Sequence, residues 1–184
     1  MSTPHPQVWS LNQFLDWESG QTERFEYLDG MIVGMVGGTV RHQLIISNIA
    51  HAFRTHLDGS SCHVFSEGLK LLTPTTLTYP DVVVTCASLD LSADVLTDAD
   101  LVVEVLSPST ADFDLGRKWE GYKKLSSLRA YVVVWQDRPA LQIYRRVSQD
   151  WTVVTLGADD SPVSLPVADL TLSLQDVYAG ADVG

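Results

Sequence analysis

The sequence predicts a mixed α/β fold in which a central mixed β-sheet is flanked by helices, and two observations support this prediction. The hydrophobic patterns follow one another as a helix, strands, a helix and strands, without the regular alternation of a βαβ winding. Three short runs are apolar and rich in β-branched residues, as strands buried on both faces are: 82–84, 101–106 and 130–135. With 184 residues, 45% of them hydrophobic, the chain is expected to form a single domain over 1–184.

The N-terminal part predicts a short helix followed by a hairpin. Ser10 is expected to cap a helix that runs to Trp17, because Gln13 follows Ser10 at the capping-box spacing. The pair Asp29-Gly30 then stands between two apolar runs, which is a strong hairpin signal. Glu26 falls in the first strand of this hairpin.

A long amphipathic helix is predicted from Val40 to Leu57. Its apolar residues fall within about 120° of one another on a helical wheel. They are Ile45, Ile46, Ile49, Phe53 and Leu57. His42 points into the middle of this apolar stripe, whereas His51 lies on the opposite face and is expected to be solvated.

The rest of the chain predicts further strands, one helix and a C-terminal hairpin. In chain order these are strands over 62–72, 79–85 and 101–106, a helix over 114–128, a strand over 130–135, a hairpin of 141–147 with 151–156, and a turn with a short helix over 162–184. A polar, acidic connection over 88–100 separates the second strand from the third.

The charge of the chain is unevenly distributed. Twelve Lys and Arg against 23 Asp and Glu give a formal net charge of −11, which excludes a basic nucleic-acid coat protein. Residues 81–116 carry eight acids and no base, whereas 117–146 carry eight bases and two acids. Such a layout suits a metal site beside an anion-binding surface, and it suits equally well a solvated acidic surface with one basic helix.

Location and redox state are predicted from what the sequence lacks. No apolar run reaches the roughly 18 residues of a transmembrane helix, and the N-terminus has no targeting pattern, so a cytoplasmic location without membrane contact is expected. Cys62 and Cys86 lie 24 residues apart without a CxxC motif. We interpret them as reduced core thiols rather than as a disulfide or a zinc pair.

Two carboxylates stand where buried strands should carry apolar side chains. Asp81 follows Pro80 at the start of one strand, and Glu104 lies inside the next. A bare carboxylate there costs several kcal/mol unless a cation compensates it, and two on neighbouring strands repel each other. A Mg²⁺ ion held by both acids and a backbone carbonyl, such as that of Val105, would resolve this. Alternatively, each acid lies at a strand end and reaches water or an arginine.

The helix after Glu104 presents a lysine toward the sheet. Lys118 groups with the apolar residues of that helix within about 80° on its wheel. A lysine aimed at two carboxylates could hold a water or neutralise a phosphorane, although a lysine on an apolar face also snorkels to solvent. Tyr122 could steady Lys118 or be an ordinary half-buried aromatic residue, and Asp114 is expected to cap the helix.

Two further polar residues face the predicted core. His42, near a helix N-terminus, could orient a water or a phosphate, although a hydrogen-bonded core histidine is the commoner case. Glu26, in a hairpin strand, is equally open to a structural or a functional role.

Several of these residues occur in order in a known family. Pro80-Asp81, the run Glu-Val-Leu-Ser-Pro-Ser-Thr at 104–110, Asp114, Lys118 and Tyr122 resemble the Uma-type restriction endonuclease family, a branch of the PD-(D/E)xK nuclease superfamily. Phe25 to Gly30 and Arg41-His42-Gln43 also match its N-terminal pattern, so that the resemblance covers about residues 8–178.

The resemblance implies a restriction-endonuclease-like core with N-terminal and C-terminal hairpin extensions and a Mg²⁺-dependent phosphodiesterase site. Asp81 and Glu104 would match the superfamily's two acids as metal ligands, with Mn²⁺ as an alternative to Mg²⁺. The superfamily's lysine normally follows the second acid by two residues, where this chain has Leu106. The resemblance to the Uma-type branch implies a lysine from the following helix instead, and Lys118 is the matching position. The expected catalytic residues are Asp81, Glu104, Lys118, Glu26, His42 and Tyr122.

The first functional hypothesis is an endonuclease that hydrolyses DNA. The bases expected to contact DNA phosphates are Arg117, Lys123, Lys124 and Arg129, with Arg145 and Arg146. Because each phosphate contact contributes about −0.9 to the log-salt slope, the DNA affinity is expected to be low and salt-sensitive.

Two other hypotheses stay open. In a non-catalytic scaffold on a nuclease fold, Asp81, Glu104 and Lys118 would not converge on one cleft. A small-molecule phosphodiesterase would have a closed pocket too narrow for a duplex. The exposed sheet edge of the 141–156 hairpin is consistent with a homodimer.

Overall fold

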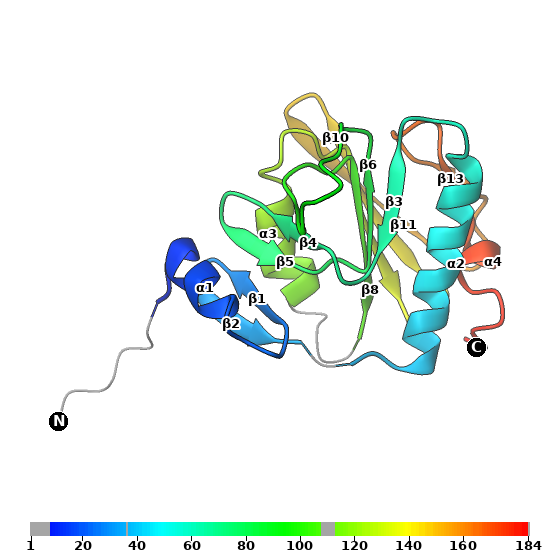
Figure 1. Ribbon diagram of the computed structural model, residues 1–184. Coiled ribbons are helices and arrows are strands. Elements are labelled where there is room, and N and C mark those ends of the chain that lie inside the picture. The colour runs from blue at the N-terminus through cyan, green and yellow to red at the C-terminus, as the bar shows by residue number, and fades with distance from the viewer. Residues whose placement is uncertain (1–7, 36, 108–112, 184) are drawn as a thin grey trace.

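Two larger β-sheets with helices packed against them make up the fold, which we describe from a computed structural model of residues 8–35, 37–107 and 113–183 (Figure 1). The first sheet has the strand order β11-β10-β9-β8-β6-β3. Its strands are β3 (His63–Ser66), β6 (Val82–Thr85), β8 (Leu101–Leu106), β9 (Ala130–Trp135), β10 (Leu141–Val147) and β11 (Asp150–Leu156). Because β8 and β9 are parallel and the other neighbours antiparallel, the predicted mixed sheet is confirmed.

The second sheet has the strand order β2-β1-β5-β4-β7. Its strands are β1 (Phe25–Leu28), β2 (Met31–Gly34), β4 (Lys70–Leu72), β5 (Thr76–Thr78) and β7 (Val95–Leu96). The predicted hairpin forms its first two strands, and both turn residues, Asp29 and Gly30, have the positive φ that such a tight turn requires. A small third sheet pairs β12 (Val163–Ser164) with β13 (Thr171–Leu172).

Helices cover both sheets. The helix α1 (Leu11–Glu18) packs on the β1–β2 hairpin and begins with the predicted capping box of Ser10 and Gln13. The helix α2 (Val40–His56) lies with α4 (Leu174–Val177) on one face of the six-stranded sheet (Figure 1). None of the helices in the described residues is long and apolar enough to cross a membrane.

The strands next to the candidate acids, β6 directly after Asp81 and β8 around Glu104, are buried on both faces, as their composition predicts. Every residue of β6 and β8 is buried. One face of these strands packs against α2, and the other packs against Tyr122, Leu125 and Leu128 from the segment that follows β8. This second face carries the candidate site.

The predicted helix over 114–128 is wrong in length and form. The segment is a π-helix, η1 (Phe113–Lys118), followed by one turn of α-helix, α3 (Trp119–Tyr122). The helix ends early because the guanidinium of Arg146 donates to the carbonyls of Lys123, Leu125 and Leu128. The side chain of Asp114, the predicted cap, lies outside the described residues.

The predicted strand over 62–72 is two strands that belong to different sheets. The break falls at Glu67 and Gly68, whose φ angles are +52° and +82°. Two consecutive residues with positive φ cannot continue an extended strand. The chain therefore leaves the six-stranded sheet after β3 and enters the five-stranded sheet as β4. The two-residue strand β7, inside the acidic connection, was not predicted.

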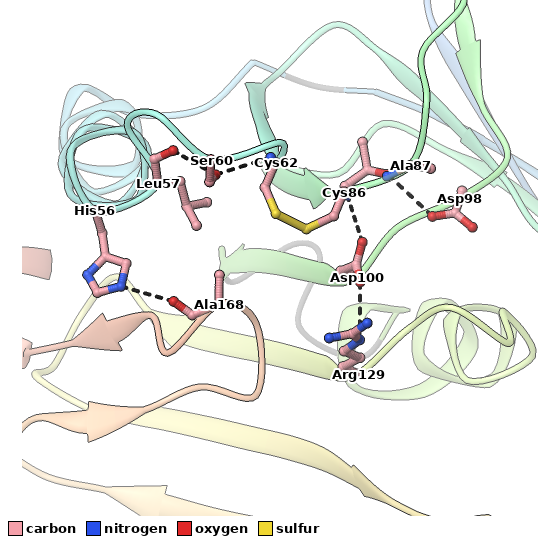
Figure 2. The surroundings of a disulfide bond; sticks show 11 residues. His56, Leu57, Ser60, Cys62, Cys86, Ala87, Asp98, Asp100, Arg129 and Ala168 are labelled. Atoms are coloured by element: carbon pink, nitrogen blue, oxygen red, sulfur yellow. Dashed lines mark hydrogen bonds and ion pairs between the residues drawn. A yellow bond between two sulfur atoms is a disulfide. The ribbon is translucent and has the colours of Figure 1, made fainter.

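The interpretation of the cysteines as reduced thiols is also wrong, because Cys62 and Cys86 form a disulfide (Figure 2). His63 faces Thr85 in the β3–β6 ladder, so the two cysteines stand opposite each other one step beyond it. Their backbone amides are held by Ser60 Oγ and by Asp100 Oδ2. A sequence spacing of 24 residues does not reveal this pairing, because it depends on the register of two strands.

Candidate functional site

Asp81 and Glu104 lie opposite each other on one face of the six-stranded sheet. Val82 faces Val103 in the β6–β8 ladder, and the same register one residue further places Asp81 opposite Glu104. Directly opposed residues of an antiparallel pair project from the same face. Glu104 is 2% exposed, and the side chain of Asp81 is 15% exposed. Both acids are therefore desolvated and close in the sheet.

His42 connects α2 to these strands. The side chain of Thr39 caps α2 by accepting from the amide of His42. The Nε2 atom of His42 lies 2.9 Å from the carbonyl oxygen of Val105 and 3.5 Å from Asp81 Oδ2. Both partners are acceptors, so Nε2 carries a proton. The amide of Val105 also donates to Asp81 Oδ2 at 2.6 Å. The Asp81 carboxylate and the Val105 carbonyl oxygen therefore lie side by side, and both face His42 Nε2.

Lys118 lies between two carboxylates. Its Nζ is 3.1 Å from Glu26 Oε1 and 3.2 Å from Glu104 Oε1. The side chains are 8%, 7% and 3% exposed for Lys118, Glu26 and Glu104, so this is a buried triad of charges. Glu26 Oε1 also accepts from the amide of Tyr79 at 2.9 Å. The hairpin strand β1 and the helix after β8 thus meet at one lysine.

Tyr122 contacts Glu104 rather than Lys118. Its hydroxyl lies 2.7 Å from Glu104 Oε1 and 2.9 Å from Thr78 Oγ1. Burial, and then the charge of Glu104, raise the pKa of Tyr122 well above its usual value, so the phenol keeps its proton. Because the single phenolic proton goes to the carboxylate, the Thr78 hydroxyl donates to the Tyr122 oxygen. This chain of hydrogen bonds fixes the orientation of Glu104.

A close approach of α3 to β5 makes these contacts possible. A Cβ on Gly121 would lie 2.5 Å from both Cγ2 and Oγ1 of Thr76, closer than real side chains come. Only glycine fits there. Tyr122 follows Gly121 directly and Lys118 precedes it by three residues, so both depend on this approach.

The predicted phosphate contacts fall into two groups. Arg117 and Lys124 are exposed and line a hollow of about 370 Å³ beside α3. Lys123 is paired with Glu120, and Arg129 is paired with Asp100 at 3.2 Å.

Arg145 and Arg146, which are also expected to contact phosphates, both donate to backbone carbonyls. Arg146 donates to three carbonyls at the end of α3 and lies 4.5 Å above the ring of Trp151. Arg145 donates to the carbonyl of Ser164. Arg146 is thus structural, because its donors hold the turn that follows α3.

Residues 11–175 match the model of the Uma2 family, described as "Putative restriction endonuclease". The chain belongs to the Uma2 family. It is 35% identical to the uncharacterized protein slr1290 of Synechocystis sp. (strain ATCC 27184 / PCC 6803 / Kazusa) over 183 residues, which cover 97% of this chain and 95% of that protein. A second uncharacterized protein of the same organism, sll1609, is 24% identical over 162 residues, 85% of this chain and 92% of the relative.

The Uma2 chain also has a solved structural neighbour. A crystal structure of a putative nuclease belonging to DUF820 from Anabaena variabilis ATCC 29413 superposes with a TM-score of 0.78. The superposition covers 96% of this chain and 99% of the neighbour at 19% sequence identity. At this identity the likeness shows the fold, and it confirms the predicted fold class.

The oxygen donors of this Uma2 chain fit a hard divalent cation. Among the residues that the structure describes, no three or more His, Cys, Asp and Glu side chains form a group that could hold a metal ion by themselves. Mg²⁺ is usually bound by one or two carboxylates together with waters and substrate phosphate. The Asp81 carboxylate and the Val105 carbonyl oxygen converge on His42 Nε2–H, a donor that stands where a cation would be coordinated. The residues therefore suit Mg²⁺ or Mn²⁺.

The sequence does not predict two residues of this site, Thr78 and Gly121. Thr78 lies in β5, and its contact with Tyr122 depends on the packing of α3 against that strand, for which the sequence gives no local signal. Gly121 did carry a signal, since an isolated glycine inside a helical pattern often marks a close packing contact.

Proposed function

We propose that this Uma2 chain is a Mg²⁺-dependent endonuclease that hydrolyses DNA phosphodiester bonds on the PD-(D/E)xK plan, with Mn²⁺ as an alternative metal. The observation that carries the proposal is the meeting of Asp81, Glu104 and Lys118 on one face of the sheet, beside the Val105 carbonyl. A buried cluster of charges is expensive to assemble, and a metal-dependent active site gives this cluster a use that a non-catalytic scaffold does not require. The meeting of these groups therefore favours a nuclease over the scaffold.

In this proposal, the site residues would have different roles in metal binding and catalysis. Asp81 and Glu104 hold the metal through carboxylate oxygens, and the Val105 carbonyl adds a neutral donor. When bound, the metal supplies Lewis acidity and stabilises charge that develops on the phosphate. Lys118 holds the attacking water and keeps a positive charge next to the reacting phosphate.

Three other residues would keep these groups in place. Glu26 fixes the Lys118 ammonium from the side opposite Glu104. Tyr122 holds Glu104 in one orientation through its phenolic hydrogen bond. His42 donates to the Val105 carbonyl and Asp81 before the metal binds, which keeps both oxygens pointing at one place.

Cleavage of supercoiled plasmid tests the proposal. The wild-type protein is expected to nick or linearise plasmid in Mg²⁺ or Mn²⁺ and to be inactive with a chelator. Asp81→Asn and Glu104→Gln keep the shape of each side chain and remove its charge, and each is expected to lower the rate roughly a hundredfold or more. Asp159→Asn, an exposed acid outside the site, is the matched control and should cleave at the wild-type rate.

Metal binding gives a second readout that does not require activity. Titration of Mn²⁺ followed by electron paramagnetic resonance should show a site in the wild type and in Asp159→Asn that is lost in Glu104→Gln. Equal cleavage by wild type and Asp81→Asn would rule out this mechanism. A folded wild type that neither cleaves DNA nor binds Mn²⁺ would leave the scaffold as the better account.

We further propose that Arg117 and Lys124 contact the DNA backbone, because they are exposed next to the helix that carries Lys118. The double variant Arg117→Ala/Lys124→Ala should bind duplex DNA more weakly in fluorescence anisotropy and reduce the log-salt slope by roughly 2. The control Arg138→Ala removes a half-exposed arginine that lies over Trp135. An unchanged slope in the double variant would place the DNA on another surface.

A further inference from the structure

The strand β11 is an unusually open edge of the six-stranded sheet. It pairs with β10 along all seven of its residues, and among the described residues no strand pairs with its other side. Val153 is 49% exposed and Val154 is 38% exposed. Such an edge presents a row of backbone N–H and C=O groups that can pair with a further strand.

This edge lacks the features that usually prevent pairing. The sequence from Asp150 to Leu156 contains no proline and no lysine, and its register with β10 is continuous, without a bulge. The opposite edge of the same sheet differs. There β3 has only four residues, and the guanidinium of Arg54 donates to the carbonyl of Val64. One edge of the sheet is therefore protected and the other is open.

We propose that β11 pairs with β11 of a second copy of this chain, antiparallel, about a two-fold axis through Val153. A two-fold axis perpendicular to the sheet keeps each face on its own side, and opposed residues must share a face. A strand that pairs with itself in this way must therefore centre on a residue and not between two. Centring on Val153 is the choice that pairs the whole strand from Asp150 to Leu156.

The resulting pairs are chemically compatible. Val153 faces Val153 of the partner subunit, and Thr152 faces Val154 of the partner subunit. Trp151 faces Thr155 of the partner subunit, so an aromatic residue lies against a β-branched one. Asp150, the only charged residue of the strand, faces Leu156 of the partner subunit.

The charge of the chain is consistent with this location for the interface. Two copies of net charge −11 repel each other over most of their surfaces. In the proposed pairing the two Asp150 residues lie six strand positions apart, about 20 Å. That separation exceeds the screening length of about 8 Å at physiological ionic strength, so their repulsion is weak. The pairing does not depend on whether the chain is a nuclease.

A cysteine at the symmetry axis tests the register directly. The two native cysteines are joined in a disulfide, so Val153→Cys adds a single free thiol. Opposed residues in an antiparallel pair have Cα atoms about 4.5 to 5.5 Å apart, a distance that a disulfide spans. Mild oxidation should therefore convert Val153→Cys into a covalent dimer. The matched control Thr155→Cys lies about 14 Å from its own copy and should not cross-link.

Sedimentation of the protein without added cysteines tests the pairing itself. The wild type should reach twice the 20.3 kDa mass of one chain as its concentration rises. Val153→Lys, which opposes two ammonium groups at the axis, should remain a monomer. Leu91→Lys, at a position 92% exposed elsewhere, is the control and should still dimerise.

Each alternative result overturns the proposal. A wild type that stays monomeric at every concentration would exclude the interface. A dimer that Val153→Lys does not dissociate would place the interface elsewhere. Preferential cross-linking of Thr152→Cys or Val154→Cys would exclude an axis through Val153.

Discussion

Lys118 is held between Glu26 and Glu104, and all three side chains are more than nine-tenths buried. A buried cation between two carboxylates loses water on every side, and the attraction offsets this loss only while all partners are present. The sequence predicted that Lys118 faces the sheet near Glu104, because Lys118 falls among the apolar residues of the predicted helix. It could not predict Glu26 as the second partner, because β1 lies in another sheet.

Removal of the Lys118 charge is expected to destabilise the protein strongly. Lys118→Met leaves two carboxylates without their cation, and the free energy of unfolding should fall by about 3 to 5 kcal/mol in urea denaturation. The double variant Lys118→Met/Glu26→Gln removes one of the stranded charges and should recover part of this loss. If the effects of the two substitutions on the free energy of unfolding were simply additive, Glu26 and Lys118 would not be energetically coupled, contrary to their 3.1 Å contact.

Tyr122→Phe tests the hydrogen bond that orients Glu104. The substitution removes only the hydroxyl, so the Thr78 hydroxyl and Glu104 lose a buried partner at an unchanged packing volume. The free energy of unfolding should fall by about 1 to 3 kcal/mol. Tyr144→Phe is the matched control, because the Tyr144 hydroxyl bonds only to Gln142 on the same strand in the described structure. Equal losses of unfolding free energy in the two variants would mean that the hydrogen bond to Glu104 stabilises the protein no more than the bond between Tyr144 and Gln142.

At the scale of elements, the sequence correctly predicted the helices and strands that depend mainly on neighbouring residues. The capping box, the Asp-Gly hairpin, α2 and the buried strands β8 and β9 all lie where the sequence placed them. The errors arose where distant residues decide the outcome. Arg146, from β10, holds the carbonyls that end α3, and the strand over 62–72 divides because its halves join different sheets.

The contact between α3 and β5 leads to an expectation for Gly121. Gly121→Ala would bring a methyl group to 2.5 Å from Thr76, so α3 must move away from the sheet. Overpacking of this kind costs about 1 to 3 kcal/mol, and cleavage should fall as well, because Lys118 and Tyr122 move with α3.

Gly116→Ala is the control for this substitution. It lies on the same helical segment, and nothing stands within 4 Å of its added Cβ. Both stability and cleavage should stay near the wild-type values. Thr76→Ala in the Gly121→Ala background should restore part of the loss in each measurement. A Gly121→Ala protein as stable and as active as the wild type would show that α3 adjusts without disturbing the site.

At the scale of the whole molecule, the charge blocks of the sequence meet in space. Among the described residues, the base-free stretch 81–116 and the basic stretch 117–146 are joined by the ion pairs of Glu104 with Lys118 and of Asp100 with Arg129. Asp100 also accepts from the amide of Cys86, so the second ion pair adjoins the disulfide (Figure 2). The net charge alone could not indicate this arrangement, because it sums two blocks that neutralise each other locally.

The disulfide is expected to stabilise the fold without contributing to the candidate site. It closes a loop of 24 residues, and the loss of such a cross-link costs about 3 kcal/mol, or roughly 6 to 12 °C in Tm for a chain of this size. Cys62→Ser/Cys86→Ser should show this loss in calorimetry, and dithiothreitol should lower the wild type to the same value while leaving the double variant unchanged. Cys86 and Asp81 lie at opposite ends of β6, about 17 Å apart along the strand, so plasmid cleavage well below Tm should stay the same. A reductant that abolished cleavage while the protein remained folded would instead connect the disulfide to the site.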